Sequence, residues 1–247
     1  EEIEQPDSFN FLGLTLDSNL SWNAHIKHII VKLARTGGII YRLKRFLPSH
    51  ILKTLYCTLA LPYLHYCSHA WGHASNKVSR SQKRIIRNIV GAKYNAHTEP
   101  ICKEINILQA SDIYYINSLI FYYKHHHNLL PPFLQSFELI TGQNIHNYNT
   151  ICSKSRVRAI ATSSKFADNR MRVALINIAN QVQNDPNIYG LMSFTLPYFK
   201  FFIKKLIITN YSYLCQNSNC FVCSEYYRPP NSPTQSQSLL QDLNLSP

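Results

Sequence analysis

Four cations recur on one side of a helix predicted over residues 78–90. Arg80, Lys83, Arg84 and Arg87 stand at positions i, i+3, i+4 and i+7, a spacing that places them on a single helix face. No acidic residue interrupts this segment, and its apolar residues lie mostly off the cationic face. Such a stripe suits contact with phosphate groups. The alternative is a solvated surface helix, although solvated faces usually mix charges of both signs.

The positive charge extends well beyond this helix. The formal net charge is +12, and fourteen Lys or Arg residues but only one acidic residue, Glu99, lie between Lys27 and Lys103. A block of this kind attracts polyanions, because each neutralised phosphate releases condensed counterions. A basic face that merely keeps the protein in solution is the alternative. The predicted nucleic-acid-binding residues are Lys32, Arg35, Arg42, Lys44, Arg45, Arg80, Lys83, Arg84, Arg87 and Lys93.

Catalytic chemistry is not expected within this chain. Two-metal phosphoryl transfer needs carboxylates held close together. The six aspartates are dispersed along the sequence, at Asp7, Asp17, Asp112, Asp168, Asp185 and Asp242. Dinucleotide-binding, P-loop and nucleophile-elbow glycine motifs are missing as well. We therefore assign no catalytic residue.

Two clusters invite a metal interpretation, and neither supports an assignment. His125, His126 and His127 are consecutive, and on a helix they would point about 100° apart, so together they cannot chelate one ion. The second cluster, Cys215, Cys220 and Cys223, has zinc-like spacing, but no His or Cys follows it as a fourth ligand. Whether these cysteines bind zinc stays open, and no metal ligand is predicted.

Cysteine usage and hydropathy bear on the location of the protein. Seven scattered cysteines, an odd number, favour reduced thiols and an intracellular protein. We expect neither a signal peptide nor a transmembrane helix, and therefore no membrane partner. The basic runs permit entry into the nucleus, although no tight cluster of Lys and Arg demands it.

The spacing of apolar residues predicts a mainly α-helical fold with one short strand at the start. The strand covers residues 9–16, and Gly37-Gly38 should stop or kink the first helix. Pro62 should break a buried helix over residues 51–69, and Ser111-Asp112 should cap a long aromatic helix. The remaining helices are expected at about residues 39–46, 98–105, 113–129, 169–183 and 198–208, with irregular structure near 146–160 and a disordered tail.

Several segments, in order, resemble a known family. Residues 9–22 (FNFLGLTLDSNLSW), 45–72 (RFLPSHILKTLYCTLALPYLHYCSHAWG) and 81–133 resemble the post-palm part of reverse transcriptases from non-LTR (LINE-type, jockey-like) retrotransposons. HNYNT at 146–150 and FFIKKLIITNY at 201–211 also fit. Residues 166–195 depart from the family, whose members tend to carry a Gly-x-x-x-Trp-Asn-x-Leu-Pro element there, and residues after 214 match nothing in it.

The resemblance implies a piece of an RNA-directed DNA polymerase. Residues 1–20 would end the palm, with Leu12 and Gly13 at the palm–thumb junction, and residues 21–97 would form a basic helical thumb-like domain. Residues 98–214 would form a smaller C-terminal helical domain, and residues 215–247 a disordered tail. The partners would be RNA and DNA, as a template–primer hybrid, together with the upstream palm of the parent protein.

Activity of this chain alone is not expected, because the family's catalytic Asp pair is absent from it. The parent polymerase would use Mg²⁺, whereas this chain is expected to carry no cofactor. The departures from the family suggest a truncated or degenerate copy. Two alternatives remain: a helical protein-interaction module with a basic surface, and a non-functional relic of a decayed element.

Overall fold

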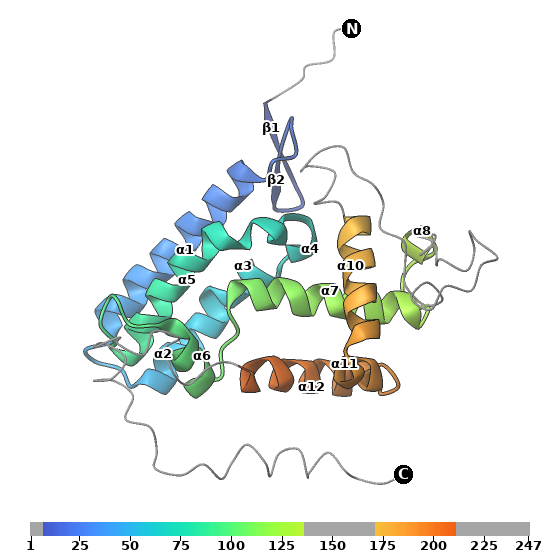
Figure 1. Cartoon of the computed structure of the whole chain (residues 1–247). Helices are drawn as coiled ribbons and strands as arrows, with labels where there is room; N and C mark the ends of the chain where they lie inside the picture. The colour runs from blue at the N-terminus through green and yellow to red at the C-terminus, as the bar shows by residue number, and fades with distance from the viewer. Residues whose placement is uncertain (1–6, 136–170, 211–247) are drawn as a thin grey trace, which may run out of the picture.

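Helices form nearly all of the regular structure, which confirms the mainly α prediction. The computed structural model describes residues 7–135 and 171–210 (Figure 1). Its elements are β1 (Ser8–Phe11), β2 (Leu14–Asp17), α1 (Asn23–Leu43), α2 (Ser49–Leu59), α3 (Leu61–His65), α4 (Ser68–Trp71), the 3₁₀ turn η1 (Gly72–Ala74), α5 (Ser75–Val90), α6 (Thr98–Glu104), α7 (Ala110–His126), α8 (Pro132–Gln135), α10 (Met171–Asn184), α11 (Pro186–Leu191) and α12 (Leu196–Thr209). The predictions for residues 146–160, for the tail and for Cys215, Cys220 and Cys223 lie outside the described residues.

The N-terminal segment is a hairpin of two strands, and the prediction of one strand over residues 9–16 is wrong. Strands β1 and β2 pair antiparallel, with Phe11 opposite Leu14, so only Leu12 and Gly13 form the turn. Both turn residues have positive φ, 47° at Leu12 and 82° at Gly13. A two-residue hairpin turn of this handedness needs positive φ at both positions, and glycine adopts it without steric cost.

Helix α1 runs unbroken through Gly37 and Gly38, so the predicted stop at these glycines is wrong. Gly37 instead permits a close helix contact. A Cβ atom on Gly37 would lie 3.2 Å from Cγ1 of Ile85 in α5, whereas a Cβ on Gly38 would meet no atom of the described residues within 4 Å. Each glycine lowers the helix propensity of α1 by about 1 kcal/mol relative to alanine. The close packing of α5 against Gly37 offsets this cost.

The chain breaks near Pro62 as predicted, and it breaks again five residues later, at Cys67. Helix α2 ends at Leu59, and α3 starts with Pro62 in its first turn, where a missing N–H costs nothing. A second break at Cys67, with φ of 47°, separates α3 from α4. Three short helices therefore replace the single buried helix that apolar periodicity indicated.

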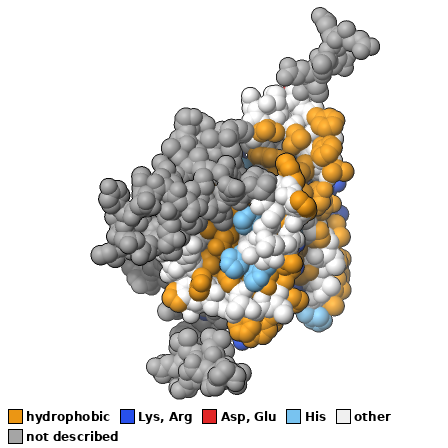
Figure 2. Space-filling model, turned by 90° about the vertical axis from the view of Figure 1, so that its right-hand side faces the viewer, with side chains coloured by type: hydrophobic (Ala, Val, Ile, Leu, Met, Phe, Trp, Pro, Cys, Tyr) orange, Lys and Arg blue, Asp and Glu red, His pale blue; other side chains and the backbone are white. Residues whose placement is uncertain are grey.

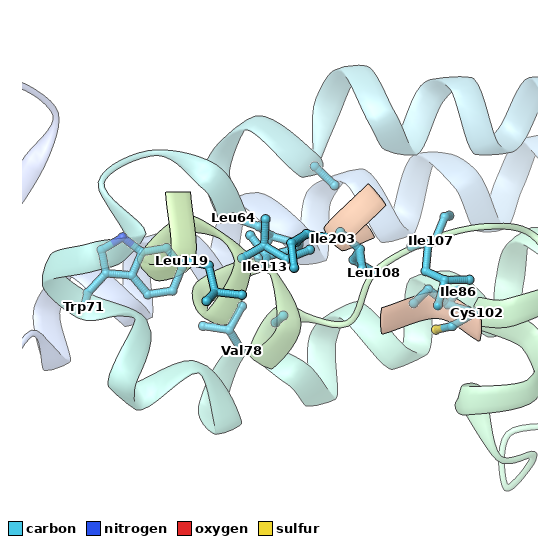
Figure 3. Packing of buried hydrophobic residues seen from close by; sticks show 14 of the residues in the cluster. Leu64, Trp71, Val78, Ile86, Cys102, Ile107, Leu108, Ile113, Leu119 and Ile203 are labelled. Carbon is cyan, nitrogen blue, oxygen red and sulfur yellow. The ribbon is translucent and has the colours of Figure 1, made fainter. Parts of the chain in front are cut away.

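One continuous core joins all of the larger helices. Figure 3 shows part of it, where Leu64, Trp71, Val78, Ile113, Leu119 and Ile203 from α3, α4, α5, α7 and α12 converge. The central helix is α7, and its aromatic residues Phe121, Tyr122 and Tyr123 are buried and pack in the core. Helix α7 starts at Ala110 rather than after Ser111-Asp112, and it ends before Asn128, whose φ is 55°, rather than at the prolines.

Gln82 is the polar centre of this core. Its side chain is 1% exposed. Its amide nitrogen donates to Tyr56 Oη and to the Leu108 carbonyl, both at 2.8 Å, and its amide oxygen accepts from the Ala110 backbone N–H at 2.8 Å. The last bond satisfies one of the N–H groups that a helix start leaves without an intrahelical partner. Gln82 thus connects α5 to α2, to the segment before α7 and to α7 itself. Two of these bonds cross the predicted domain boundary at residues 97/98, and that boundary stays a prediction.

Replacing Gln82 by Leu should lower the free energy of unfolding by at least about 3 kcal/mol. The change leaves a buried hydroxyl, a carbonyl and an N–H unpaired, and each such group costs about 1–3 kcal/mol. Urea unfolding followed by circular dichroism measures this, with Gln181→Leu on the exposed side of α10 as the matched control. Equal stabilities of the two variants would contradict the structural role of Gln82.

A buried histidine attaches the hairpin to the helices. His25 is 3% exposed, and its Nδ1 accepts from the Thr15 backbone N–H at 3.4 Å. Its ring lies edge-on to Trp71 and Trp22, with centroids 5.9 Å and 6.3 Å away. Its Nε2 is also buried, and it has no hydrogen-bond partner among residues 7–135 and 171–210. Burial, and then the positive charge of His28, lower the pKa of His25 below its usual 6.5.

Acidification should therefore weaken the fold through His25. Below pH 6.5 the unfolded chain takes up a proton that the folded His25 resists, so the free energy of unfolding falls as the pH decreases from 6.5 toward the lowered pKa. Burial also lowers the pKa values of His65, His69 and His73, so His25 accounts for part of the loss. We expect His25→Phe to flatten the decline between pH 6.5 and 5, and His50→Gln, at an exposed position, is the control variant. Fluorescence of Trp22 and Trp71, the chain's two tryptophans, reports the transition; parallel curves for wild type and His25→Phe would refute the assignment.

Candidate nucleic-acid interface

Helices α1 and α5 lie side by side and run in the same direction (Figure 1). Near their starts, Lys77 Nζ donates to Asn23 Oδ1 at 2.6 Å. Further along, Gly37 faces Ile85 at close approach. Because the two helices are held together at both points, their outward sides form one continuous surface.

Exposed cations cover this surface. Arg35 and Arg42 lie one helical turn before and after Gly38, and Lys27 lies two turns before Arg35. On α5, Lys77, Arg80 and Arg84 are exposed at positions i, i+3 and i+7. We call these six residues the α1–α5 basic face: Lys27, Arg35, Arg42, Lys77, Arg80 and Arg84.

Among the described residues, no negative side chain forms an ion pair with the α1–α5 basic face. The sequence has no Asp or Glu between Ser18 and Thr98. Within residues 7–135 and 171–210, the guanidinium groups of Arg35, Arg42, Arg80 and Arg84 make no hydrogen bond or ion pair. Exposed, unneutralised guanidinium groups are suited to bidentate contact with phosphate oxygens.

Four of the predicted cations are half-buried, and three of these face neighbouring parts of the fold. Lys32 points toward α3, with its Nζ 6.0 Å from the centroid of the Tyr63 ring. Lys83 lies toward α6 and Cys102. Burial raises the pKa of the Cys102 thiol to about 12, and the positive charge of Lys83 acts in the opposite direction. Arg87 is the third. These three side chains contribute to packing as well as to the net charge.

Arg87 anchors the segment that follows α5. Its Nε donates to the carbonyl of Ala96 at 2.7 Å, and its guanidinium carbon lies 5.9 Å from the centroid of the Tyr94 ring. Desolvation by burial lowers the pKa of Arg87 from its usual value. Because Ala96 is buried, no water replaces this bond easily if the side chain is removed.

The remaining predicted cations gather at the shared C-terminal end of α1 and α5. Lys44 follows α1, with its Nζ 4.5 Å from the centroid of the Tyr41 ring, and Arg45 is exposed in the next turn. Lys93 is exposed just after α5. Positive charges there also complement the negative ends of the two helix dipoles, which is a structural reason for them independent of any ligand.

Leu12 and Gly13 lie apart from these C-terminal cations. Their turn contacts the body through Tyr66, whose hydroxyl donates to the Leu12 carbonyl. Strand β2 packs against the N-terminal part of α1. The structure therefore places the predicted palm–thumb junction at the opposite end of α1 from Arg42, Lys44 and Arg45.

Other faces of the molecule have a different character. Figure 2 shows the side at the right of Figure 1, where hydrophobic and histidine side chains are exposed among uncharged polar and backbone atoms, with Lys and Arg at its edge. His127 belongs to a packing contact, since its Nε2 lies 2.8 Å from the Met192 carbonyl.

Among the described residues, no group of three or more His, Cys, Asp or Glu side chains could hold a metal ion. No helix in that part of the chain is long and apolar enough to cross a bilayer.

The sequence prediction missed a groove between the two helices and two cations of the α1–α5 basic face. Lys27 and Lys77 belong to the basic block but were not singled out. Ser81, Arg84 and Asn88 line the groove from α5, at positions i, i+3 and i+7. The spacing of these three residues is visible in the sequence. Ser81 and Asn88 are uncharged, however, and four cations dominate the same helix.

No protein-family model, curated protein or solved structure matches this chain. The candidate interface is therefore argued from its own geometry and charge.

Replacing Arg87 by Ala should destabilise the fold, whereas replacing Arg84 by Ala should not. The first change leaves the buried Ala96 carbonyl without its charged donor, a loss of about 1–3 kcal/mol. The second removes an exposed side chain, for which a change within about 0.5 kcal/mol is usual. Urea unfolding of both variants tests the distinction, and an equal loss in both would show that Arg87 is no anchor.

Proposed function

We propose that this protein binds a template–primer nucleic acid through the α1–α5 basic face, as a non-catalytic part of a retrotransposon RNA-directed DNA polymerase. The observation that carries the binding proposal is the absence of acidic residues from 18 to 98, together with six exposed cations on two packed helices. The polymerase context rests on the resemblance of residues 9–133 to the post-palm segment of LINE-type reverse transcriptases.

The dimensions of the two helices suit a nucleic-acid backbone. At 1.5 Å per residue, the 21 residues of α1 extend about 30 Å. Along B-form DNA that length corresponds to roughly nine phosphates of one strand. Cations spread along such a length can follow the backbone. Contacts of this kind set register and orientation, and they carry little sequence information.

The hairpin is the proposed link to an upstream palm. Phe9 and Phe11 stand on one face of β1, are more than half exposed and stack with ring centroids 6.3 Å apart. Leu12 is exposed beside them. An apolar surface of this kind is suited to burial against another domain. In the parent polymerase that domain would hold the catalytic aspartates and Mg²⁺.

The same hairpin supports a second candidate, a protein-interaction module. In that case Phe9, Phe11 and Leu12 would contact another protein, and the α1–α5 basic face would contribute charge complementarity with an acidic partner. The two candidates differ in what charge reversal on α5 does to nucleic-acid binding.

Reversing two charges on α5 should weaken nucleic-acid binding for every sequence tested. We expect Arg80→Glu with Arg84→Glu to raise the Kd for an RNA–DNA hybrid at least tenfold. The slope of log K against log salt should become shallower by about 2, since each phosphate contact contributes roughly 0.9 for B-DNA. Fluorescence anisotropy over a range of salt concentrations measures both quantities.

The matched control is Lys200→Glu with Lys204→Glu, which changes the net charge equally on exposed positions of α12. If the α12 variant weakens binding as much as the α5 variant, general charge attraction explains binding and the α1–α5 basic face is no interface. Binding by the wild type that shows no steep salt dependence would remove the proposal altogether.

A further inference from the structure

A groove between α1 and α5 opens onto the α1–α5 basic face. Its volume is about 180 Å³, and its walls come from both helices. From α1 it is lined by Leu33, Ala34, Gly37, Gly38 and Tyr41, and from α5 by Ser81, Arg84, Ile85 and Asn88. Gly38 keeps it open, because a Cβ atom there would meet nothing within 4 Å.

The two walls differ in chemistry. The α1 wall is apolar and ends in the exposed ring of Tyr41, beside which Lys44 Nζ lies 4.5 Å from the ring centroid. The α5 wall carries a hydroxyl, a guanidinium and an amide, from Ser81, Arg84 and Asn88. A flat ligand with a π-face and hydrogen-bonding edges would satisfy both walls at once, since aromatic rings stack and amides bond to base edges.

The size of the groove restricts its occupant. Pockets that enclose drug-sized ligands usually measure about 300–1,000 Å³. A groove of 180 Å³ is below that range, so it suits one ring system rather than a whole nucleotide. The sugar and phosphates would stay outside, where Arg84, Arg42 and Lys77 supply positive charge.

We propose that the α1–α5 groove receives a single unpaired nucleobase from a strand whose phosphates lie on the α1–α5 basic face. The inference rests on the proposed nucleic-acid binding and specifies its ligand as a duplex that carries an unpaired or terminal base. The base enters beside Tyr41, its edge meets Ser81 and Asn88, and Arg84 at the rim binds the adjoining phosphate. Regular paired duplex leaves the groove empty.

Two probes and one substitution test this directly. The probes are a fully paired RNA–DNA hybrid and the same hybrid with one unpaired adenine in its DNA strand. Wild-type protein should bind the second about tenfold more tightly, the effect usual for one stacked base. Gly38→Leu fills the groove and should bring the ratio of the two Kd values close to one. Tyr41→Leu should lower the ratio as well, through loss of the ring.

The matched control is Gly190→Leu in α11, where a Cβ atom also meets nothing within 4 Å. It should retain the wild-type ratio, and urea unfolding should show that Gly38→Leu is at least as stable as wild type, because leucine favours a helix over glycine. Equal affinity of the wild type for both probes, or a ratio unchanged in Gly38→Leu, would overturn the groove proposal. If Arg80→Glu with Arg84→Glu still weakens binding in that case, the proposed function stands alone; if the wild type binds neither probe, both fall.

Discussion

The buried amide of Gln82 sets the rotation of α5, and the placement of charge follows from that rotation. Successive residues on a helix point about 100° apart, so positions two residues away on either side lie on the opposite face. With Gln82 bonded to Tyr56, Leu108 and Ala110, the side chains of Arg80 and Arg84 must face outward. A turn of α5 about its axis would leave three buried polar groups unpaired and bring a charge toward the core. Satisfying one glutamine therefore also orients the cations.

Burial is strong enough to hold two cationic helices together. Like charges on α1 and α5 repel, but exposed charge pairs are worth at most about 1 kcal/mol and are screened by salt. Each fully buried aliphatic side chain contributes about 1.5–3 kcal/mol. Helix α1 buries Ile26, Ile29, Leu33 and Ile40, and α5 buries Val78, Ile85, Ile86 and Ile89. The fold can therefore keep an unneutralised surface, which leaves the arginines available to an external anion.

The sequence predicted the helical class and the amphipathic nature of α5 because both depend on local periodicity. It failed where a distant residue decides the outcome. Considered locally, Gly37-Gly38 indicates that the helix stops. Helix α1 nevertheless continues through both residues, and glycine is needed at position 37 because Ile85 of α5 packs closely against it. The pairing of two strands was similarly missed, because eight alternating residues fit one strand as well as two short ones.

The prediction of the basic residues was also limited because contacts with distant residues are not visible in the local sequence. Charge and spacing identify a cationic segment, but they do not show which cations the fold uses internally. Lys32 lies against Tyr63, Lys83 faces α6, and Arg87 is bonded to the Ala96 carbonyl. A helix stripe of four cations therefore presents two fully exposed ones, Arg80 and Arg84, while Lys77 joins them from one turn earlier. The number of phosphates that α5 can neutralise is accordingly smaller than its charge suggests, and the groove beside Arg84 is where additional specificity would have to arise.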